Sequence, residues 1–453
     1  MDQPTAVAAN APLKKAASWR LLMVLGVASV ISGDFAGWNF GLVEGGWGGM
    51  LIATLLMAAM YFAVVFSLAE LAAALPVAGG GYEFARRALS EWGGFITGVS
   101  ILIEYAIAPA AIATFISAYV ESLTGVGGWP VSLACYLIFV GCHLAGVGEA
   151  LKLMLVITAI AAVALLVFYI AMAPKFSTAN LSDIAPIETL GSSQFLPYGV
   201  SGAWQAIPFA LWFFLAVEGV ALAGEESANP GRDLPRGLIG AMTLLFCFAM
   251  ATLLLTPGGA GSRQIGPSGD PLLTALASPN AYGGPNAVYW VVNIAGLAGL
   301  VASFFAIIYG YSRLTFALAR AGYLPALMQR TNRRGAPTWA LIIPGAIGMM
   351  LSFAVAGQWL MLVAVFGATV SYVLMMLSHI KLRRCEPGLA RPYRTPGGVW
   401  VSGAGLLLAI AATVAGLLAH PAVVGATVGV YLLAALWFAL LRREAEPVGS
   451  EGS

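Results

Sequence analysis

Charged residues are scarce in this chain. Asp, Glu, Lys and Arg make up only 9% of its 453 residues, whereas hydrophobic residues make up 60%, and the mean hydropathy is +0.88. A globular domain in water carries about 25% charged residues, mostly on its surface. This composition therefore excludes a soluble protein and indicates a membrane protein.

Cysteine and histidine are also rare, and the patterns that would mark an enzyme are missing. The four cysteines, Cys135, Cys142, Cys247 and Cys385, have no CxxC spacing, and the three histidines are scattered, so we predict no disulfide and no metal site. The glycines at 79–81 are followed by no Gly-Lys-Ser/Thr sequence, which excludes a phosphate-binding loop. We therefore expect neither an enzyme nor a bound cofactor.

Long apolar runs, in contrast, fill most of the chain. A run of about 20 residues spans ~30 Å of hydrocarbon as a helix, and twelve such runs can be placed, which predicts an all-α membrane protein with twelve transmembrane helices. The eighth is open to a helical continuation as far as Ala319, and only His420 and Pro421 separate the last two. The runs are 20–42, 47–70, 95–120, 129–147, 151–173, 203–224, 237–256, 286–312, 338–356, 359–380, 400–419 and 421–441.

The basic residues are distributed unevenly over the predicted loops. With the N-terminus inside, only Lys175 and Arg263 of the 22 Lys and Arg residues fall in outer loops, while Lys152 and Arg313 lie near inner helix ends. Because positively charged loops stay cytoplasmic, we expect a multi-pass protein of the bacterial inner (plasma) membrane with both termini in the cytoplasm. The formal net charge of +2 reflects this topology and gives no argument for nucleic-acid binding.

Two apolar runs are interrupted by an acid next to glycine. Residues 31–37 read ISGDFAG, with Asp34 between two glycines, and residues 212–219 read WFFLAVEG, with Glu218 before a glycine. A carboxylate at membrane depth, beside residues that loosen a helix, indicates a cavity that handles a polar or cationic group. Two matching interruptions half a chain apart predict a transporter built from inverted repeats.

Four segments together form a recognisable set of motifs. Residues 32–35 read SGDF and residues 76–82 read PVAGGGY; the segment 218–236 combines Glu218, a Glu-Glu pair, Asn-Pro and RDLPR; residues 391–397 read RPYRTPG. Over nearly the whole chain this set resembles the motifs of the amino acid, polyamine and organocation (APC) superfamily of permeases. The resemblance implies a LeuT-like fold of inverted five-helix repeats, in which helices 1 and 6 are broken.

The same resemblance predicts how the chain is divided. We expect a cytoplasmic N-terminal segment at 1–17, a first five-helix repeat at 18–173, an extracytoplasmic loop with at most short structure at 174–202, a second repeat at 203–380, accessory helices 11 and 12 at 381–443, and a cytoplasmic tail at 444–453.

Within the superfamily, three segments most resemble bacterial ethanolamine permeases. They are 32–41 (SGDFAGWNFG), 104–113 (EYAIAPAAIA) and 303–313 (SFFAIIYGYSR). The resemblance implies uptake of ethanolamine by alternating access. Two other possibilities stay open at this point: an amino acid or polyamine permease of the same superfamily, and, from another class, a permease-like amine sensor or a channel.

The charge of Asp34 agrees with an amine substrate. Amino acid permeases hold the substrate carboxylate with the exposed amides of the first break, but a carboxylate there would repel that group and attract an ammonium by roughly 4 kcal/mol at ~4 Å and an effective dielectric of ~20. Ethanolamine has an ammonium, a hydroxyl and no carboxylate. The alternative is that Asp34 is a hydrogen-bonded acid that caps the broken helix.

Glu104 lies about ten residues into the third predicted helix, in a stretch with no other charge. No basic residue falls at that depth, so three states are open: a protonated acid, a hydrogen bond to a neighbouring helix, or contact with a bound cation such as the substrate ammonium.

Glu218 lies in the second interruption, and the APC resemblance assigns its position to gating or proton coupling. Many proton-coupled relatives carry a lysine three residues after a Thr in helix five, but here Thr158 is followed by Ala161 at that spacing. Proton symport through Glu218, uniport and exchange therefore all stay open.

Aromatic residues surround these acids, and most membrane aromatics serve lipid contact or packing. Trp212 precedes Glu218 by six residues, where related permeases place an aromatic that covers the substrate, and a cation over an indole gains ~0.5–2 kcal/mol. The predicted partners are a small-molecule amine and the lipid bilayer, without nucleic acid, and the oligomeric state is left open. The predicted substrate-binding residues are Ser32, Gly33, Asp34, Phe35, Glu104, Tyr105, Trp212, Phe214 and Glu218, with Glu218 also the predicted site of proton coupling.

Overall fold

The computed structural model describes residues 17–77, 79–146, 150–419 and 421–445, which fold into helices and the segments that connect them. Across these ranges there is no β-sheet, only two isolated bridges. The α-helices are α1 Trp19–Val30, α2 Ser32–Phe35, α3 Phe40–Ala74, α4 Gly81–Ala88, α5 Glu91–Thr124, α6 Trp129–Ala145, α7 Ala150–Met172, α8 Thr178–Leu181, α9 Gly199–Gln205, α10 Ile207–Trp212, α11 Pro230–Ala260, α12 Ser262–Ile265, α13 Pro271–Ala277, α14 Ala287–Arg320, α15 Thr338–Ala354, α16 Gly357–Cys385, α17 Val399–Ala419 and α18 Pro421–Ala445; the 3-10 helices are η1 Ala173–Lys175, η2 Val217–Glu226 and η3 Ala326–Gln329.

The long helices are apolar enough to cross a membrane. Within the described ranges nine segments have the necessary length and composition, and the shorter helices α6 and α15 are also apolar. The prediction of an all-α membrane protein is therefore confirmed, while the number of twelve spans and the two inverted repeats stay predictions. The eighth predicted helix continues to Arg320, beyond the expected Ala319, and His420 lies outside the described residues.

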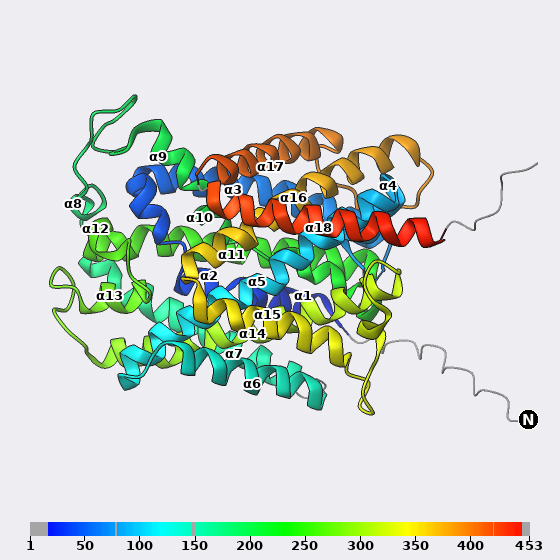
Figure 1. The fold of residues 1–453 in the computed structure, drawn as a ribbon. Helices are drawn as coiled ribbons and strands as arrows, with labels where there is room; N and C mark the ends of the chain where they lie inside the picture. Colours follow the sequence, from blue (N-terminus) through cyan, green and yellow to red (C-terminus); the bar gives the residue numbers. More distant parts are fainter. Residues whose placement is uncertain (1–16, 78, 147–149, 420, 446–453) are drawn as a thin grey trace, which may run out of the picture.

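The helices form one elongated bundle, seen from the side in Figure 1. The described start of α1, the short α4 and the end of α18 lie at one end, on the right of the view, and α8, α9, α12 and α13 lie at the other. We call the first end the arginine-rich end, because α4 and the last turns of α14 and α16 bring basic side chains there. It corresponds to the side that the sequence predicts to be cytoplasmic.

The first predicted interruption is a real break in the helix. Helix α1 stops at Val30, a single turn (α2) follows, Ala36 is extended and Gly37 has a φ of +99°, before α3 begins at Phe40. The side chain of Asn39 holds this loop, since it accepts from the Gly37 amide at 3.0 Å and donates to the carbonyl oxygen of Gly266 at 2.9 Å. The freed backbone groups therefore find partners inside the protein, as they must at membrane depth.

The second interruption lies between α10 and η2. Ala216 adopts a φ of +75°, the only positive φ of a non-glycine residue in the described ranges, and the chain continues as a 3-10 helix from Val217. The left-handed conformation costs an alanine roughly 1–2 kcal/mol, so the surrounding packing must impose it.

A buried ionic cluster joins the last turns of α3 and α16 to the loop before α17. Glu70 is fully buried, and the Arg383 side chain donates to its two oxygens at 2.8 and 2.5 Å. Arg391 lies 3.0 Å and His379 3.3 Å from the same carboxylate, and the Thr395 amide donates to it at 2.7 Å. The RPYRTPG motif thus supplies partners to an acid that could not otherwise be buried.

Candidate functional site

The two helix breaks lie against each other in the middle of the bundle. The Trp212 indole donates to the Ala36 carbonyl oxygen at 3.0 Å, and Trp38 stacks on Phe213 with ring centroids 5.4 Å apart. A Cβ atom on Gly33 would lie 2.6 Å from the Trp212 carbonyl oxygen, so only glycine permits this approach. The predicted residues Gly33 and Trp212 therefore hold the two breaks together.

Glu218 lies at the start of η2, where three tyrosines from other helices gather around it. Its Oε1 accepts from Tyr105 of α5 at 3.3 Å and its Oε2 accepts from Tyr372 of α16 at 3.1 Å. The Tyr372 hydroxyl is 3.0 Å from that of Tyr61 on α3. All four side chains are buried, so the carboxyl group is tied to three other helices and shielded from bulk water.

Glu104 lies beside Glu218 and is fully buried. The two carboxyl groups interact electrostatically. Neither Glu104 oxygen makes a hydrogen bond of normal geometry to a described residue, although Glu218 and the backbone of Ala216 are close by. Two ionised carboxylates in one buried site repel each other, and a proton or a bound cation removes that repulsion.

Asp34 lies apart from this pair. It is fully buried and faces α11 and α7: its Oδ1 is 3.5 Å from the Thr252 hydroxyl, which is 2.7 Å from the hydroxyl of Tyr169. Its Oδ2 has no partner among the described residues, and no described contact joins Asp34 to Glu104 or Glu218. Asp34 also accepts from no described backbone amide, so it does not cap the broken helix.

The remaining predicted residues lie around the breaks. The Ser32 amide donates to the Ser303 hydroxyl of α14 at 3.0 Å. Phe35 packs edge-on against Tyr119, with ring centroids 6.4 Å apart, and Phe214 packs against the ring of Tyr61 at 5.5 Å. Phe35 and Phe214 therefore serve packing in this conformation, and Phe214 does so against one of the tyrosines near Glu218.

Two residues of the site, Tyr61 and Tyr372, were not predicted from the sequence. Each is one of 15 tyrosines in an otherwise apolar run, without a neighbouring charge to mark it. The only signal is general: a buried tyrosine hydroxyl needs a hydrogen-bond partner, and an acid at membrane depth needs donors.

A small cavity of about 20 Å³ lies next to the acid pair, between the start of η2, α1 and α14. Tyr105, which bonds to Glu218, and Gly219 line it on one side, Leu25 and Ser29 line it from α1, and Tyr309 and Arg313 line it from α14.

An ion pair adjoins this cavity through Arg313 and Tyr309, which line it. Arg313 of α14 pairs with Glu226 at the end of η2, the Tyr309 hydroxyl donates to the same carboxylate at 3.1 Å, and the guanidinium lies 4.3 Å from the Tyr309 ring centroid. The two charged side chains are only 29% and 20% exposed, so water screens the pair less than a surface ion pair.

The backbone fixes Glu226 to the start of α1. The Ala17 amide donates to the Glu226 carbonyl oxygen, and the Ala228 amide donates to the Ala17 carbonyl oxygen, each at 3.0 Å. The start of α1 and the end of η2 thus form one unit, and the ion pair joins that unit to α14.

Comparison with known proteins identifies the family. The profile of a family described as amino acid permease matches residues 19–440. An uncharacterised transporter of Rhizobium meliloti (strain 1021) is 27% identical over 429 residues, 91% of this chain and 89% of the relative. The branched-chain amino acid permease BcaP of Bacillus subtilis (strain 168) is 24% identical, with 86% and 85% covered. The methylthioribose transporter of the same organism is 25% identical, with 83% and 82% covered. With its apolar helices, its two breaks and this match over almost its whole length, the chain belongs to the amino acid permease family of membrane transporters.

Proposed function

We propose that this transporter carries ethanolamine across the bacterial inner membrane by alternating access. The observation that supports this most is the buried pair of Glu104 and Glu218, which has tyrosine hydroxyls but no basic side chain as a described partner. With a proton on one of the two acids, an ammonium would neutralise the pair, and the substrate hydroxyl would find donors and acceptors in Tyr105 and Tyr372. The α-carboxylate of an amino acid would meet repulsion there.

The relatives leave room for this substrate. Their names include a branched-chain amino acid permease and a methylthioribose transporter, so proteins of similar sequence carry chemically different solutes. The substrate is then decided by the side chains in the site and not by the fold. In our proposal the space around the ammonium is shaped by Ser32, Gly33, Phe35, Trp212 and Phe214. The arginine-rich end faces the cytoplasm.

Serine is expected to compete poorly with ethanolamine for uptake, because serine differs from it by an α-carboxylate that the two glutamates repel. The measurement is inhibition of labelled ethanolamine uptake into proteoliposomes that contain the purified protein. We expect the inhibition constant of serine to be larger than that of unlabelled ethanolamine by roughly a hundredfold or more. Both compounds have the same amino alcohol portion, but the carboxylate of serine adds an unfavourable charge contact. Equal inhibition by the two compounds would favour an amino acid permease.

The same proteoliposomes separate transport from the other classes of function. A carrier exchanges external labelled ethanolamine for unlabelled ethanolamine inside, and internal substrate accelerates this entry. A sensor that binds without translocation gives no counterflow, and a channel gives no acceleration by internal substrate.

Asp34→Asn is expected to weaken ethanolamine binding roughly tenfold while preserving the fold. The substitution keeps shape and hydrogen bonding but removes a negative charge that acts on the neighbouring site through a low-dielectric interior. The measurement is direct binding of labelled ethanolamine to the purified protein. Thr252→Val is the control, because it removes the hydroxyl that faces Asp34 and leaves the charge. An unchanged affinity in Asp34→Asn would end the proposed role of this acid in amine binding.

A further inference from the structure

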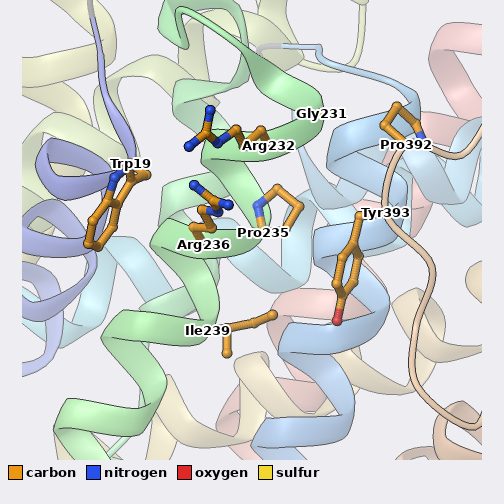
Figure 2. A pocket seen from close by; sticks show the side chains of 8 residues that line it. All are labelled: Trp19, Gly231, Arg232, Pro235, Arg236, Ile239, Pro392 and Tyr393. Carbon is orange, nitrogen blue, oxygen red and sulfur yellow. The ribbon is translucent and has the colours of Figure 1, made fainter.

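A second, open pocket lies at the arginine-rich end, away from the acid pair (Figure 2). Its walls come from three segments: Trp19 at the start of α1, the first turns of α11, and the loop residues Pro392 and Tyr393. Its volume is about 680 Å³, which falls within the range of ~300–1,000 Å³ typical of small-molecule sites. The pocket is therefore large enough for a polar headgroup.

Two arginines give this pocket its charge. Arg232 and Arg236 are one turn apart on α11 and therefore lie on the same face of the helix; Figure 2 shows both guanidinium groups extending toward the side of Trp19. Both side chains are exposed, and neither has a hydrogen bond or ion pair to a described residue. The nearest acid in sequence, Asp233, is buried and accepts from the Asn229 amide at 3.1 Å, so it is engaged elsewhere.

The other walls are amphipathic. Trp19 and Tyr393 are partly buried, and such aromatics prefer the level of the lipid headgroups. Ile239 extends the lining by one further turn of α11, away from the arginine-rich end. Cations at headgroup level above an apolar wall match a phospholipid, whose phosphate lies directly above its acyl chains.

We propose that this pocket binds the headgroup of an anionic phospholipid of the cytoplasmic leaflet. The two guanidinium groups hold the phosphate, for which the planar Arg donors are well suited, and basic pockets between membrane helices bind such headgroups. The packing of α11 on the loop preserves the pocket, since a Cβ on Gly231 would lie only 2.8 Å from the Cβ of Pro392. The bound lipid joins the start of α1 to α11.

The test compares lipid binding to the purified full-length protein and to the double variant Arg232→Gln/Arg236→Gln. Native mass spectrometry with phosphatidylglycerol and phosphatidylcholine measures the bound fraction of each lipid. We expect the wild type to prefer phosphatidylglycerol and the double variant to lose that preference, with affinity lower by roughly tenfold or more. The matched control is Arg330→Gln/Arg333→Gln, which removes two exposed arginines from the same predicted side but outside the pocket.

Three outcomes would overturn the proposal. They are equal binding of phosphatidylglycerol by the double variant and the wild type, an equal loss in the control variant, and displacement of the lipid by millimolar inorganic phosphate, which would indicate a site for free anions. Because both arginines are exposed, the double variant is expected to fold, and its melting temperature in lipid-free detergent checks this directly.

Discussion

Glu218→Gln is expected to abolish the accumulation of ethanolamine driven by a pH gradient while exchange of ethanolamine across the membrane continues. Glutamine keeps the size of the side chain and can still bond to both tyrosines, accepting from one through its oxygen and donating to the hydroxyl of the other through its amide group, but it cannot carry a proton. Accumulation requires a proton to be bound and released in each cycle, whereas exchange requires only that the loaded carrier moves. The measurement compares uptake under an imposed pH gradient with counterflow in the same proteoliposomes.

Glu104→Gln is the matched control, because it removes the neighbouring buried acid. In our proposal Glu104 holds the ammonium, so we expect Glu104→Gln to lower the affinity for ethanolamine roughly a hundredfold. This loss is somewhat smaller than the full attraction between two opposite charges ~4 Å apart at an effective dielectric of ~20. A Glu218→Gln variant that still concentrates ethanolamine, or wild-type uptake that ignores the pH gradient, would contradict proton coupling at Glu218.

Arg313→Glu is expected to open the cavity below the acid pair, and the double variant Arg313→Glu/Glu226→Arg is expected to close it again. The single change places two carboxylates together at the junction between α14 and the unit formed by η2 and the start of α1. The repulsion favours separation of that unit from α14. A cysteine at Ser29, which lines the cavity, reports the change through its rate of labelling by a membrane-impermeant thiol reagent.

We expect labelling in Arg313→Glu to be roughly tenfold faster than in the wild type, which corresponds to a shift of about 1.4 kcal/mol in the conformational equilibrium. In the charge-swapped double variant we expect a rate near that of the wild type. The exposed cysteines Cys142, Cys247 and Cys385 are replaced beforehand. Arg320→Glu is the control, because Arg320 ends the same helix without an ion pair to a described residue. Equal labelling of all variants would show that the ion pair between Arg313 and Glu226 does not limit access to the cavity. It would leave the proposed substrate untouched, since labelling is independent of transport.

The parts of this protein that follow from short-range sequence features were predictable. Apolar runs gave the membrane helices, and an acid beside glycine marked both breaks, because glycine loosens a helix at a place where a charge needs a cavity. Gly33 illustrates this, since its lack of a side chain is what lets the second break approach.

The parts that depend on the direction of a side chain were not predictable. The sequence suggested one site for three acids, but the turn at α2 directs Asp34 toward Thr252 and Tyr169, away from the two glutamates. The contribution of Tyr372 to the site depends on a contact with Glu218 across 154 positions of sequence, and no local pattern carries that information.

The cluster around Glu70 also has a consequence for the synthesis of the protein. Arg383, which neutralises this acid, follows it by 313 residues, so at ~5–20 residues per second the ribosome needs roughly 15–60 s to supply the partner. During that interval the end of α3 carries an acid without its native partners, and any chain that ends before Arg383 retains this defect. The last third of the sequence therefore decides whether an early helix can remain stably in the membrane, and truncated chains should be recognised and degraded by membrane proteases.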